Sequence, residues 1–130
     1  MELLLISALA LHSIAASSPP ANGHQLLVQC SDAVRAPAGN LTSPEQVVGG
    51  ALCIGLVRGV VEINKFYEVA PDDRTLFCSP SGESLAQAIQ VIVGFLRAHP
   101  ERLAQQDTRL ILAAFREAYP CKGELPSASG

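Results

Sequence analysis

The stretch VVGGALCIGLVRGVVEINKFY, residues 47–67, decides the fold class of this 130-residue chain. Its apolar residues lie nearly all round an ideal helix, which is typical of a helix that is buried on several sides. Ser43 precedes Pro44 and Gln46 at the spacing of a capping box, so the helix is expected to begin there. The stretch therefore predicts the central helix of a small helical bundle.

Four glycines interrupt this helix, at Gly49, Gly50, Gly55 and Gly59. Each glycine in a helix interior costs up to about 1 kcal/mol relative to alanine. That cost indicates that another helix backbone approaches closely, either within the chain or across a dimer face. Gly55 and Gly59 also have the spacing of a membrane dimer motif. Arg58, inside a run of only about 15 apolar residues, argues against a membrane span.

Apolar residues elsewhere also follow the helical period, and strand-like alternation is absent. Further helices are expected over residues 24–35, 85–98 and 108–119. Ser84 and Gln87 form a second capping box, Asp107 is the expected cap of the last helix, and Pro100 ends the third. The side chains expected to face inward are Leu26, Leu27, Cys30 and Val34 on the first helix and Leu85, Ile89, Ile92 and Leu96 on the third. The predicted fold is all-α, a small bundle of four to five helices.

Both ends of the chain are expected to lie outside this bundle. Residues 1–22 are predicted to be a signal peptide, because an apolar segment is followed by small residues, and a cut after Ser17 would leave Ala15 at position −3. The absence of Lys and Arg before the apolar segment is atypical. A buried helix or a membrane anchor is the alternative, although a span needs about 20 apolar residues. Residues 122–130 are predicted to be a disordered tail.

The charge and the cysteine spacing exclude several classes of function. The net charge is −3, and no basic face with interleaved aromatic residues is present, so nucleic acid is not an expected partner. No C-x-x-C motif or His pair has zinc-ligand spacing, and His24 and His99 stand alone. No metal or other cofactor is therefore expected. No catalytic constellation can be assembled from the sequence.

Four cysteines, Cys30, Cys53, Cys78 and Cys121, remain after signal removal. An even number in a short exported chain predicts two disulfides. Consecutive helices joined by a short loop usually run antiparallel, which favours Cys30–Cys53 and Cys78–Cys121. The other two connectivities stay open. A redox-active pair is disfavoured, because the chain has no C-x-x-C.

Three blocks of the sequence resemble the type VI amidase immunity family (Tai-like, resistance-associated immunity proteins). The blocks are CIGLVRGV (53–60), CSPSGESLAQAIQVIVGFLRAHPERL (78–103) and LILAAFREAYPC (110–121). The sequence departs from the family at Leu56, where a tyrosine is common. The resemblance implies a helical domain over residues 23–121, located in the periplasm and often dimeric. It implies a protein without enzymatic activity that binds a type VI secreted peptidoglycan amidase and covers the active site of that enzyme.

The acidic segment EVAPDDRT, residues 68–75, is the candidate for contact with this amidase. Its residues Glu68, Asp72, Asp73 and Arg74 are the predicted partner-binding residues. The acidic groups can meet a basic rim on the amidase and speed association. Two alternatives stay open: a solvated loop without a partner, and a periplasmic binding or acid-stress chaperone-like protein. No membrane contact is expected after signal removal.

Overall fold

The computed structural model describes residues 21–69 and 74–122, and the regular secondary structure in these residues is helical. The elements in chain order are α1 (Gly23–Arg35), the short 3-10 helix η1 (Ala36–Ala38), α2 (Pro44–Glu68), α3 (Leu85–Ala98), the 3-10 helix η2 (Pro100–Arg102) and α4 (Asp107–Ala118). The described part holds no strand, apart from one isolated bridge between Asn22 and Gln106. The predicted all-α class is confirmed.

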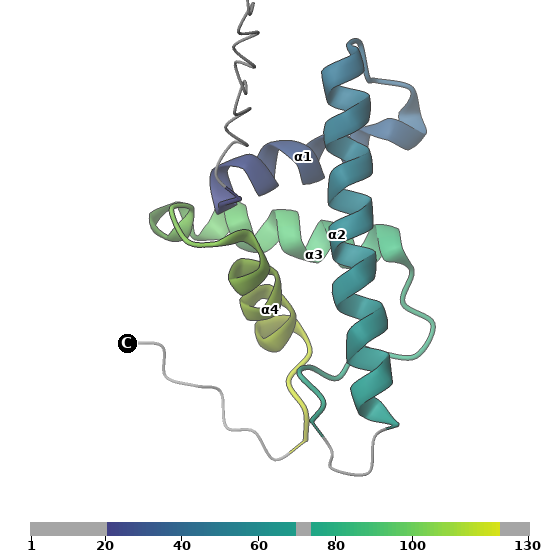
Figure 1. Ribbon diagram of the computed structural model, residues 1–130, viewed down its shortest axis with the longest axis vertical. Helices are drawn as coiled ribbons and strands as arrows, with labels where there is room; N and C mark the ends of the chain where they lie inside the picture. Colours follow the sequence, from purple (N-terminus) through teal and green to yellow (C-terminus); the bar gives the residue numbers. More distant parts are fainter. Residues whose placement is uncertain (1–20, 70–73, 123–130) are drawn as a thin grey trace, which may run out of the picture.

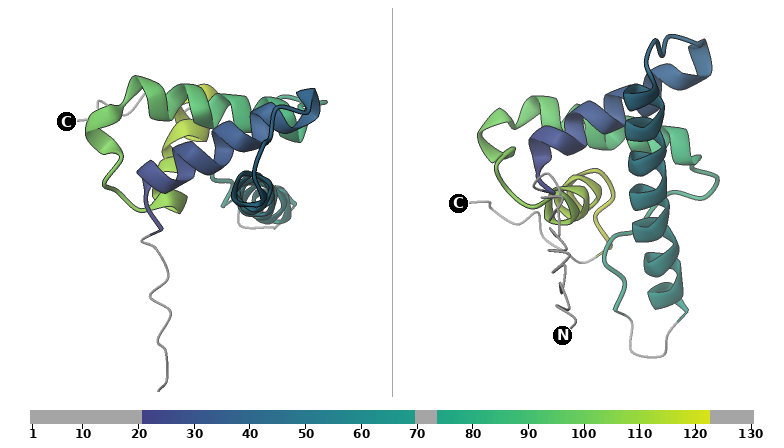
Figure 2. Two further views of the ribbon diagram at one scale, coloured as in Figure 1. Left: turned by 90° about the horizontal axis from the view of Figure 1, so that it is seen from above. Right: turned by 45° about the horizontal axis from the view of Figure 1, so that its top comes forward.

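Two of the four α-helices, α1 and α3, run side by side in opposite directions, and α2 crosses α1 at a steep angle (Figures 1 and 2). The fourth helix, α4, descends from the end of α3 that is farthest from α2 (Figure 1). The core contains Leu26, Cys30, Cys53, Val57, Phe77, Ile89, Ile92, Leu96, Leu110, Ile111 and Phe115. These residues come from all four α-helices and from the segment that precedes α3.

The helices begin where their capping residues are. Both predicted capping boxes are present, with Ser43 and Gln46 opening α2 and Ser84 and Gln87 opening α3. The prediction for the last helix is wrong by one position: Gln106 is the N-cap of α4, and Asp107 lies in the first turn. The Asp107 carboxylate accepts a hydrogen bond from the backbone N–H of Thr108, 2.6 Å away. It therefore satisfies a free amide of the first turn from within the helix.

The inward stripe of α1 also differs from the prediction at one position. Val34 is 40% exposed, whereas Ala33 is 7% exposed and packs into the core. The close approach of α2 explains why Ala33 and not Val34 faces the core. A Cβ atom added to Gly50 would lie 3.2 Å from the Ala33 backbone nitrogen, so only a small side chain fits on this side of α1. The helical period alone does not distinguish two adjacent positions at the edge of a stripe.

The start of α1 is fixed to the connection before α4. Gly23 N–H donates to the Gln105 carbonyl at 3.0 Å, and the His24 N–H donates to the Leu103 carbonyl at 3.2 Å. A Cβ atom on Gly23 would lie 2.9 Å from both Cα and the carbonyl oxygen of Leu103. Glycine is therefore the residue that lets α1 approach this connection.

The interpretation of α2 as the central helix is wrong. Its buried residues lie along one side only: Gly49, Gly50, Cys53, Val57 and Asn64. Length is the physical reason: 25 residues make a helix about 37 Å long, whereas the 13 residues of α1 span only about 20 Å. A helix this much longer than its neighbours lies along the outside of the bundle and leaves much of its surface uncovered.

The four α2 glycines divide into two pairs. A Cβ atom on Gly49 or Gly50 would lie within 3.2 Å of α1, so the predicted close approach is confirmed at these two residues. At Gly55 and Gly59 a Cβ atom would meet nothing within 4 Å, so the prediction of a close contact inside the chain is wrong there. These two glycines lie on the uncovered side of α2.

The two disulfides have the favoured connectivity, Cys30–Cys53 and Cys78–Cys121. The first joins α1 to α2 inside the core, where both cysteines are fully buried. The second joins the segment before α3 to the end of α4 at the surface. The argument that led to the first pair was inaccurate, because α1 crosses α2 steeply instead of running antiparallel to it (Figure 1). Two crossing helices still meet at one point, and Cys30 and Cys53 lie at that point.

Candidate partner-binding site

The segment predicted to meet a partner, residues 68–75, begins in the last turn of α2 and returns to the core at Phe77. Its return is fixed by Asn64, a side chain of α2 that is only 1% exposed. The Asn64 carboxamide oxygen accepts hydrogen bonds from the backbone N–H groups of Leu76 (2.8 Å) and Phe77 (3.3 Å). Its Nδ2 donates to the Phe77 carbonyl at 2.9 Å. A buried asparagine with its polar atoms satisfied in this way holds the returning chain against α2.

The same stem is fixed to α4 as well. Arg116 Nε donates to the Leu76 carbonyl at 3.2 Å, and the Cys78 N–H donates to the Tyr119 carbonyl at 2.9 Å. The Cys78–Cys121 disulfide lies directly beside this second hydrogen bond. The segment therefore extends from a stem that is held by two helices and one covalent bridge.

Two of the four predicted partner-binding residues lie in the described part of this segment. Glu68 is exposed, and one of its carboxylate oxygens accepts a hydrogen bond from Asn64 Nδ2 at 3.1 Å. Arg74 is also exposed, at the point where the described chain resumes. Asp72 and Asp73 lie outside the described residues. Glu68 and Arg74 thus mark the two ends of the segment, next to the stem that Asn64 holds.

The sequence analysis did not identify the uncovered side of α2 as a surface. Large apolar side chains that are more than a third exposed occur along the helix and just beyond its end: Val47, Val48, Leu52, Ile54, Ile63, Phe66 and Val69. By length and composition, α2 is a helix that could cross a membrane, yet its buried side packs against the bundle. The sequence did contain a sign of the uncovered side. The charged residues Arg58, Glu62 and Lys65 are confined to one edge of the helix when the residues are placed at 100° intervals.

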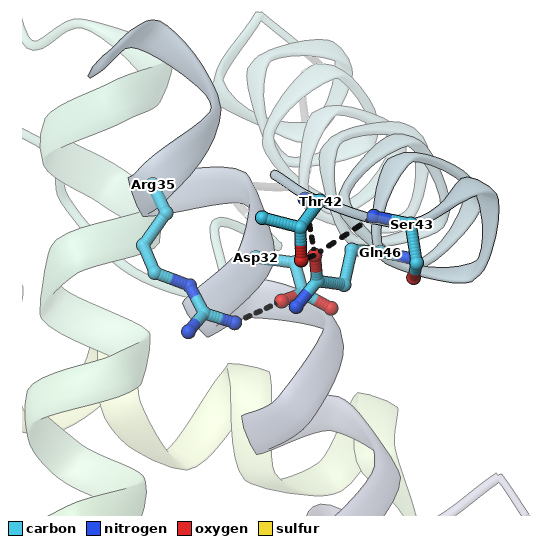
Figure 3. Close-up of polar contacts among 5 residues, drawn as sticks. All are labelled: Asp32, Arg35, Thr42, Ser43 and Gln46. Atoms are coloured by element: carbon cyan, nitrogen blue, oxygen red, sulfur yellow. Dashed lines mark hydrogen bonds and ion pairs between the residues drawn. The ribbon is translucent and has the colours of Figure 1, made fainter. Parts of the chain in front are cut away.

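A groove of about 490 Å³ lies between α1 and the first turns of α2. Its lining residues are Gln25, Val28, Gln29 and Asp32 from α1 and Pro44, Glu45, Gln46, Val48, Gly49 and Leu52 from α2. Figure 3 shows the polar corner beside this groove, where the Arg35 guanidinium donates to the buried carboxylate of Asp32. In the same corner the Gln46 carboxamide oxygen accepts from the Thr42 N–H at 2.7 Å and from the Ser43 N–H at 3.2 Å. These contacts fix the polar wall, while the remaining wall is apolar.

His99 forms structural contacts with two carboxylates and one aromatic ring. His99 Nδ1 lies 3.1 Å from a Glu101 oxygen, and its Nε2 lies 3.7 Å from a Glu117 oxygen. The imidazole ring packs on Phe95, with the ring centroids 4.5 Å apart. These contacts join the end of α3 to α4. Among residues 21–69 and 74–122, no group of three His, Cys, Asp or Glu side chains could hold a metal ion.

Comparison with protein families gives a match that covers the helices and both disulfides. The model of the Rap1a immunity proteins matches residues 22–121. The chain belongs to this family. The matched region begins at the N-cap of α1 and ends at Cys121, so it contains both disulfides and all four α-helices. No curated protein and no solved structure matches the chain.

Membership of this family has three direct consequences. Immunity proteins are not enzymes, so the chain is a binding protein. An immunity protein implies a cognate toxin as its partner. The two disulfides, together with the family, point to a location outside the cytoplasm, because disulfides persist in oxidising compartments.

Proposed function

We propose that this immunity protein acts in the periplasm, where it binds a type VI secreted peptidoglycan amidase and inhibits the amidase by covering its active site. The amidase as target rests on the resemblance of the three sequence blocks described above. The structural observation that supports the proposal is the stem fixed by Asn64, which presents the acidic segment 68–75 from a rigid base. Because Asn64 holds Leu76 and Phe77 against α2 before any partner is present, these residues need no further ordering when a partner binds.

Export would release the domain into that compartment. The Ala21 carbonyl accepts from the Asp107 N–H at 3.1 Å, and the Asn22 side chain caps α1. Both residues therefore belong to the folded domain. We place the end of the removed signal peptide before Ala21, a position that suits the cut after Ser17. Mass determination of the protein recovered from the periplasm tests this placement, and a mature chain that lacks Ala21 would contradict it.

The proposed function is tested by capture followed by an inhibition assay. Tagged, oxidised protein is mixed with periplasmic and type VI-secreted extracts, and bound proteins are identified by mass spectrometry. The expected result is a single partner that hydrolyses purified peptidoglycan and loses this activity at equimolar immunity protein. Capture of no partner, or of a partner that is not a peptidoglycan hydrolase, would contradict the proposal.

The contribution of the acidic segment is tested with charge-reversal variants. Replacing Glu68, Asp72 and Asp73 together by lysine is expected to slow association with the captured amidase at least tenfold at low salt, because long-range attraction is lost. Glu62→Lys is the matched control, since Glu62 is an exposed acid on the same helix that lies outside the segment. If the triple variant associates as fast as the control, the segment is not the contact surface.

A second candidate function, a chaperone-like binder of unfolded proteins, is favoured by the exposed apolar side chains of α2. Such a protein would suppress the aggregation of unrelated clients at low pH. Light scattering of an acid-denatured client measures this activity directly. If client aggregation is unchanged in the presence of the protein, this alternative is excluded.

A further inference from the structure

We propose that a groove between α1 and α3 binds one fatty acid, with the carboxylate at Arg97 and the acyl chain in the apolar end of the groove. This inference goes beyond the proposed inhibition of an amidase, because it concerns a small ligand. It also concerns a different surface, which contains no residue of the acidic segment 68–75.

Two adjoining hollows, called here together the α1–α3 groove, form this site. A polar hollow of about 310 Å³ is lined by Ser31, Arg35 and Arg97 among others, and an apolar hollow of about 440 Å³ reaches the start of α3. Val34 and Gln90 line both hollows, so one ligand can extend across the two. The antiparallel helices α1 and α3 form the long walls (Figures 1 and 2). Both volumes lie in the range of about 300–1,000 Å³ that is typical of small-molecule sites.

The charge of the groove favours an anionic ligand. The chain has 12 acidic and 9 basic residues, yet no Asp or Glu lines either hollow. Arg35 donates to Asp32, whereas Arg97 makes no hydrogen bond or ion pair with the residues that the structure describes. A guanidinium without a partner presents two parallel donors that match the two oxygens of a carboxylate. The α1–α2 groove differs in this respect, because Asp32 and Glu45 line it.

The second hollow favours an acyl chain. Its larger apolar side chains come from α1, η1, α2 and α3: Val34, Pro37, Ile54, Leu85 and Ile89. Val34 is 40% exposed and Ile54 is 37% exposed, so apolar surface in this hollow remains open to a ligand. No charged residue lines the hollow, and its carboxamide, Gln90, lies on the border with the polar hollow. A fatty acid has the same division into one charged end and one long apolar end.

Gly94 keeps the groove open at a cost to the stability of α3. It lies in the interior of this helix and lines the polar hollow together with Arg97. A glycine at such a position is less favourable than alanine. A Cβ atom on Gly94 would meet nothing within 4 Å, so packing within the described chain does not require glycine here. A ligand that lies against the backbone of α3 at this point accounts for the missing side chain.

Calorimetric titration of the purified, oxidised protein with octanoate, decanoate and dodecanoate tests the proposal, each below its micelle concentration. Dodecanoate is expected to bind with a Kd of about 10 µM, one molecule per chain. Each methylene group that is buried strengthens binding up to about fourfold, so octanoate should bind about tenfold or more weakly than dodecanoate. Decyltrimethylammonium has the tail length of decanoate and the opposite charge, and it should bind more weakly than decanoate. Absence of dodecanoate binding, or equal affinity for the two ten-carbon ligands, would overturn the proposal.

Two matched pairs of variants test the two ends of the polar hollow. Arg97→Gln is expected to weaken dodecanoate binding about tenfold or more, because the charged donor is lost. Arg109→Gln is its control, since Arg109 is exposed on α4 and lines neither hollow. Gly94→Leu fills the hollow and is expected to abolish binding, whereas Gly59→Leu adds the same side chain at an open position of α2. Circular dichroism confirms that each variant is folded. Equal effects within either pair would overturn the proposal.

Backbone amide chemical shifts locate the bound fatty acid. Dodecanoate is expected to shift the resonances of Val34, Gln90 and Gly94, while those of Ile63 and Phe66 on the uncovered side of α2 stay unchanged. Shifts confined to α2 would show that the ligand binds its exposed apolar side chains, and the proposal would be wrong. It would also be wrong if the groove resonances respond only to the captured amidase, since the occupant would then be a protein. Because fatty-acid binding is measured without the amidase, failure of this proposal and failure of the proposed function remain distinguishable.

Discussion

At the scale of single residues, Asn64 has the largest predicted effect. It is a polar side chain inside the core, and it supplies the acceptor for two backbone N–H groups and a donor for one backbone carbonyl. Its partners are Leu76 and Phe77, which lie 12 and 13 positions further along the chain, so these hydrogen bonds form only in the folded protein. Asn64 thus links the core directly to the presentation of the acidic segment.

Replacing Asn64 by alanine is expected to lower the free energy of unfolding by about 2–4 kcal/mol, because buried backbone groups lose their partners. Chemical denaturation at neutral pH measures the change. Asn64→Asp is the companion variant, since it keeps the acceptor oxygen and removes the donor. The matched control is Asn40→Ala, because Asn40 is exposed. An Asn64→Ala variant as stable as the control would contradict the role given to this side chain.

Two glycines are expected to respond to alanine in opposite directions. Gly23→Ala should destabilise the protein by about 1–3 kcal/mol, since the new Cβ atom overlaps the backbone of Leu103. Gly94→Ala, in the interior of α3 where a Cβ atom meets nothing within 4 Å, should stabilise it by up to about 1 kcal/mol. Thermal unfolding of both variants measures the difference. The reverse order would show that α1 does not approach the 103–107 connection as described.

At the scale of elements, the two disulfides differ in exposure. Cys30 and Cys53 are fully buried between α1 and α2, whereas Cys78 is exposed and Cys121 is half-buried. In the chain-entropy description the bridges are worth about 3 and about 4 kcal/mol respectively, for loops of 23 and 43 residues. Accessibility, not loop length, is expected to decide which bridge reacts first with a reductant.

Mild reduction of the native protein is expected to open Cys78–Cys121 while Cys30–Cys53 stays intact, since a thiolate must reach the sulfur that it attacks. Alkylation followed by peptide mass mapping identifies the opened bridge. The partly reduced protein should then become sensitive to proteases between residues 69 and 78, because one of the anchors of the stem is lost. Simultaneous labelling of all four cysteines would indicate global unfolding instead.

A contact between elements also makes stability depend on pH. The Tyr119 hydroxyl at the end of α4 donates to the carboxylate of Glu83, just before α3, and burial raises the pKa of Glu83 above 4.5. The folded protein therefore binds this proton more tightly than the unfolded chain does. Its stabilising effect is fully present below pH 4.5 and is lost as the pH rises through the folded pKa.

Relative to a Glu83→Gln variant, the wild type is thus expected to gain stability on acidification from pH 7 to about pH 4, by less than about 1 kcal/mol because Glu83 is only partly buried. Urea denaturation from pH 7 to about pH 3 measures this gain and also covers the range in which the Glu101 control responds. Glu101→Gln is the control, because the pKa of Glu101 is shifted in the opposite direction and its contribution to stability therefore changes with pH in the opposite sense. Its own backbone N–H and the nearby His99 lower the pKa of Glu101, so the stability from this group is lost below pH 4.5. Equal pH profiles for the two variants would contradict both assignments.

At the scale of the whole molecule, the long outer helix leaves an apolar surface that α1, α3 and α4 cannot cover. The family resemblance implies that such proteins are often dimeric. If two copies cover this surface for each other, folding and association are linked, and the midpoint of thermal unfolding should rise with protein concentration. Calorimetry over a hundredfold range of concentration tests this prediction, and a constant midpoint would contradict it.

Local features of the sequence were sufficient for the helices and for their bounds. The capping boxes at Ser43 and Ser84 and the proline at position 100 act within a few residues, so their positions in the chain specify where α2 begins and where α3 begins and ends. Both disulfides have the pairing that was predicted from the sequence, although Cys30–Cys53 joins two crossing helices and not the antiparallel pair on which that prediction rested. The predicted start of α4 was wrong by one residue, because an aspartate can either cap a helix or lie in its first turn, and Asp107 does the latter.

The arrangement of these helices was decided by the tertiary structure. In a helix that is apolar nearly all round, the few charged residues mark one exposed edge but do not show which of the other sides the neighbouring helices cover. For this reason α2 was assigned to the centre although it lies at the edge. The role of Asn64 was not predictable either, because its hydrogen bonds form only once residues 76 and 77 have returned to α2. Short-range propensities and caps act along the chain, whereas covering a surface depends on the relative lengths and crossing of helices that are distant in the sequence. For this reason the same stretch that determined the fold class could not show that one side of α2 is left uncovered.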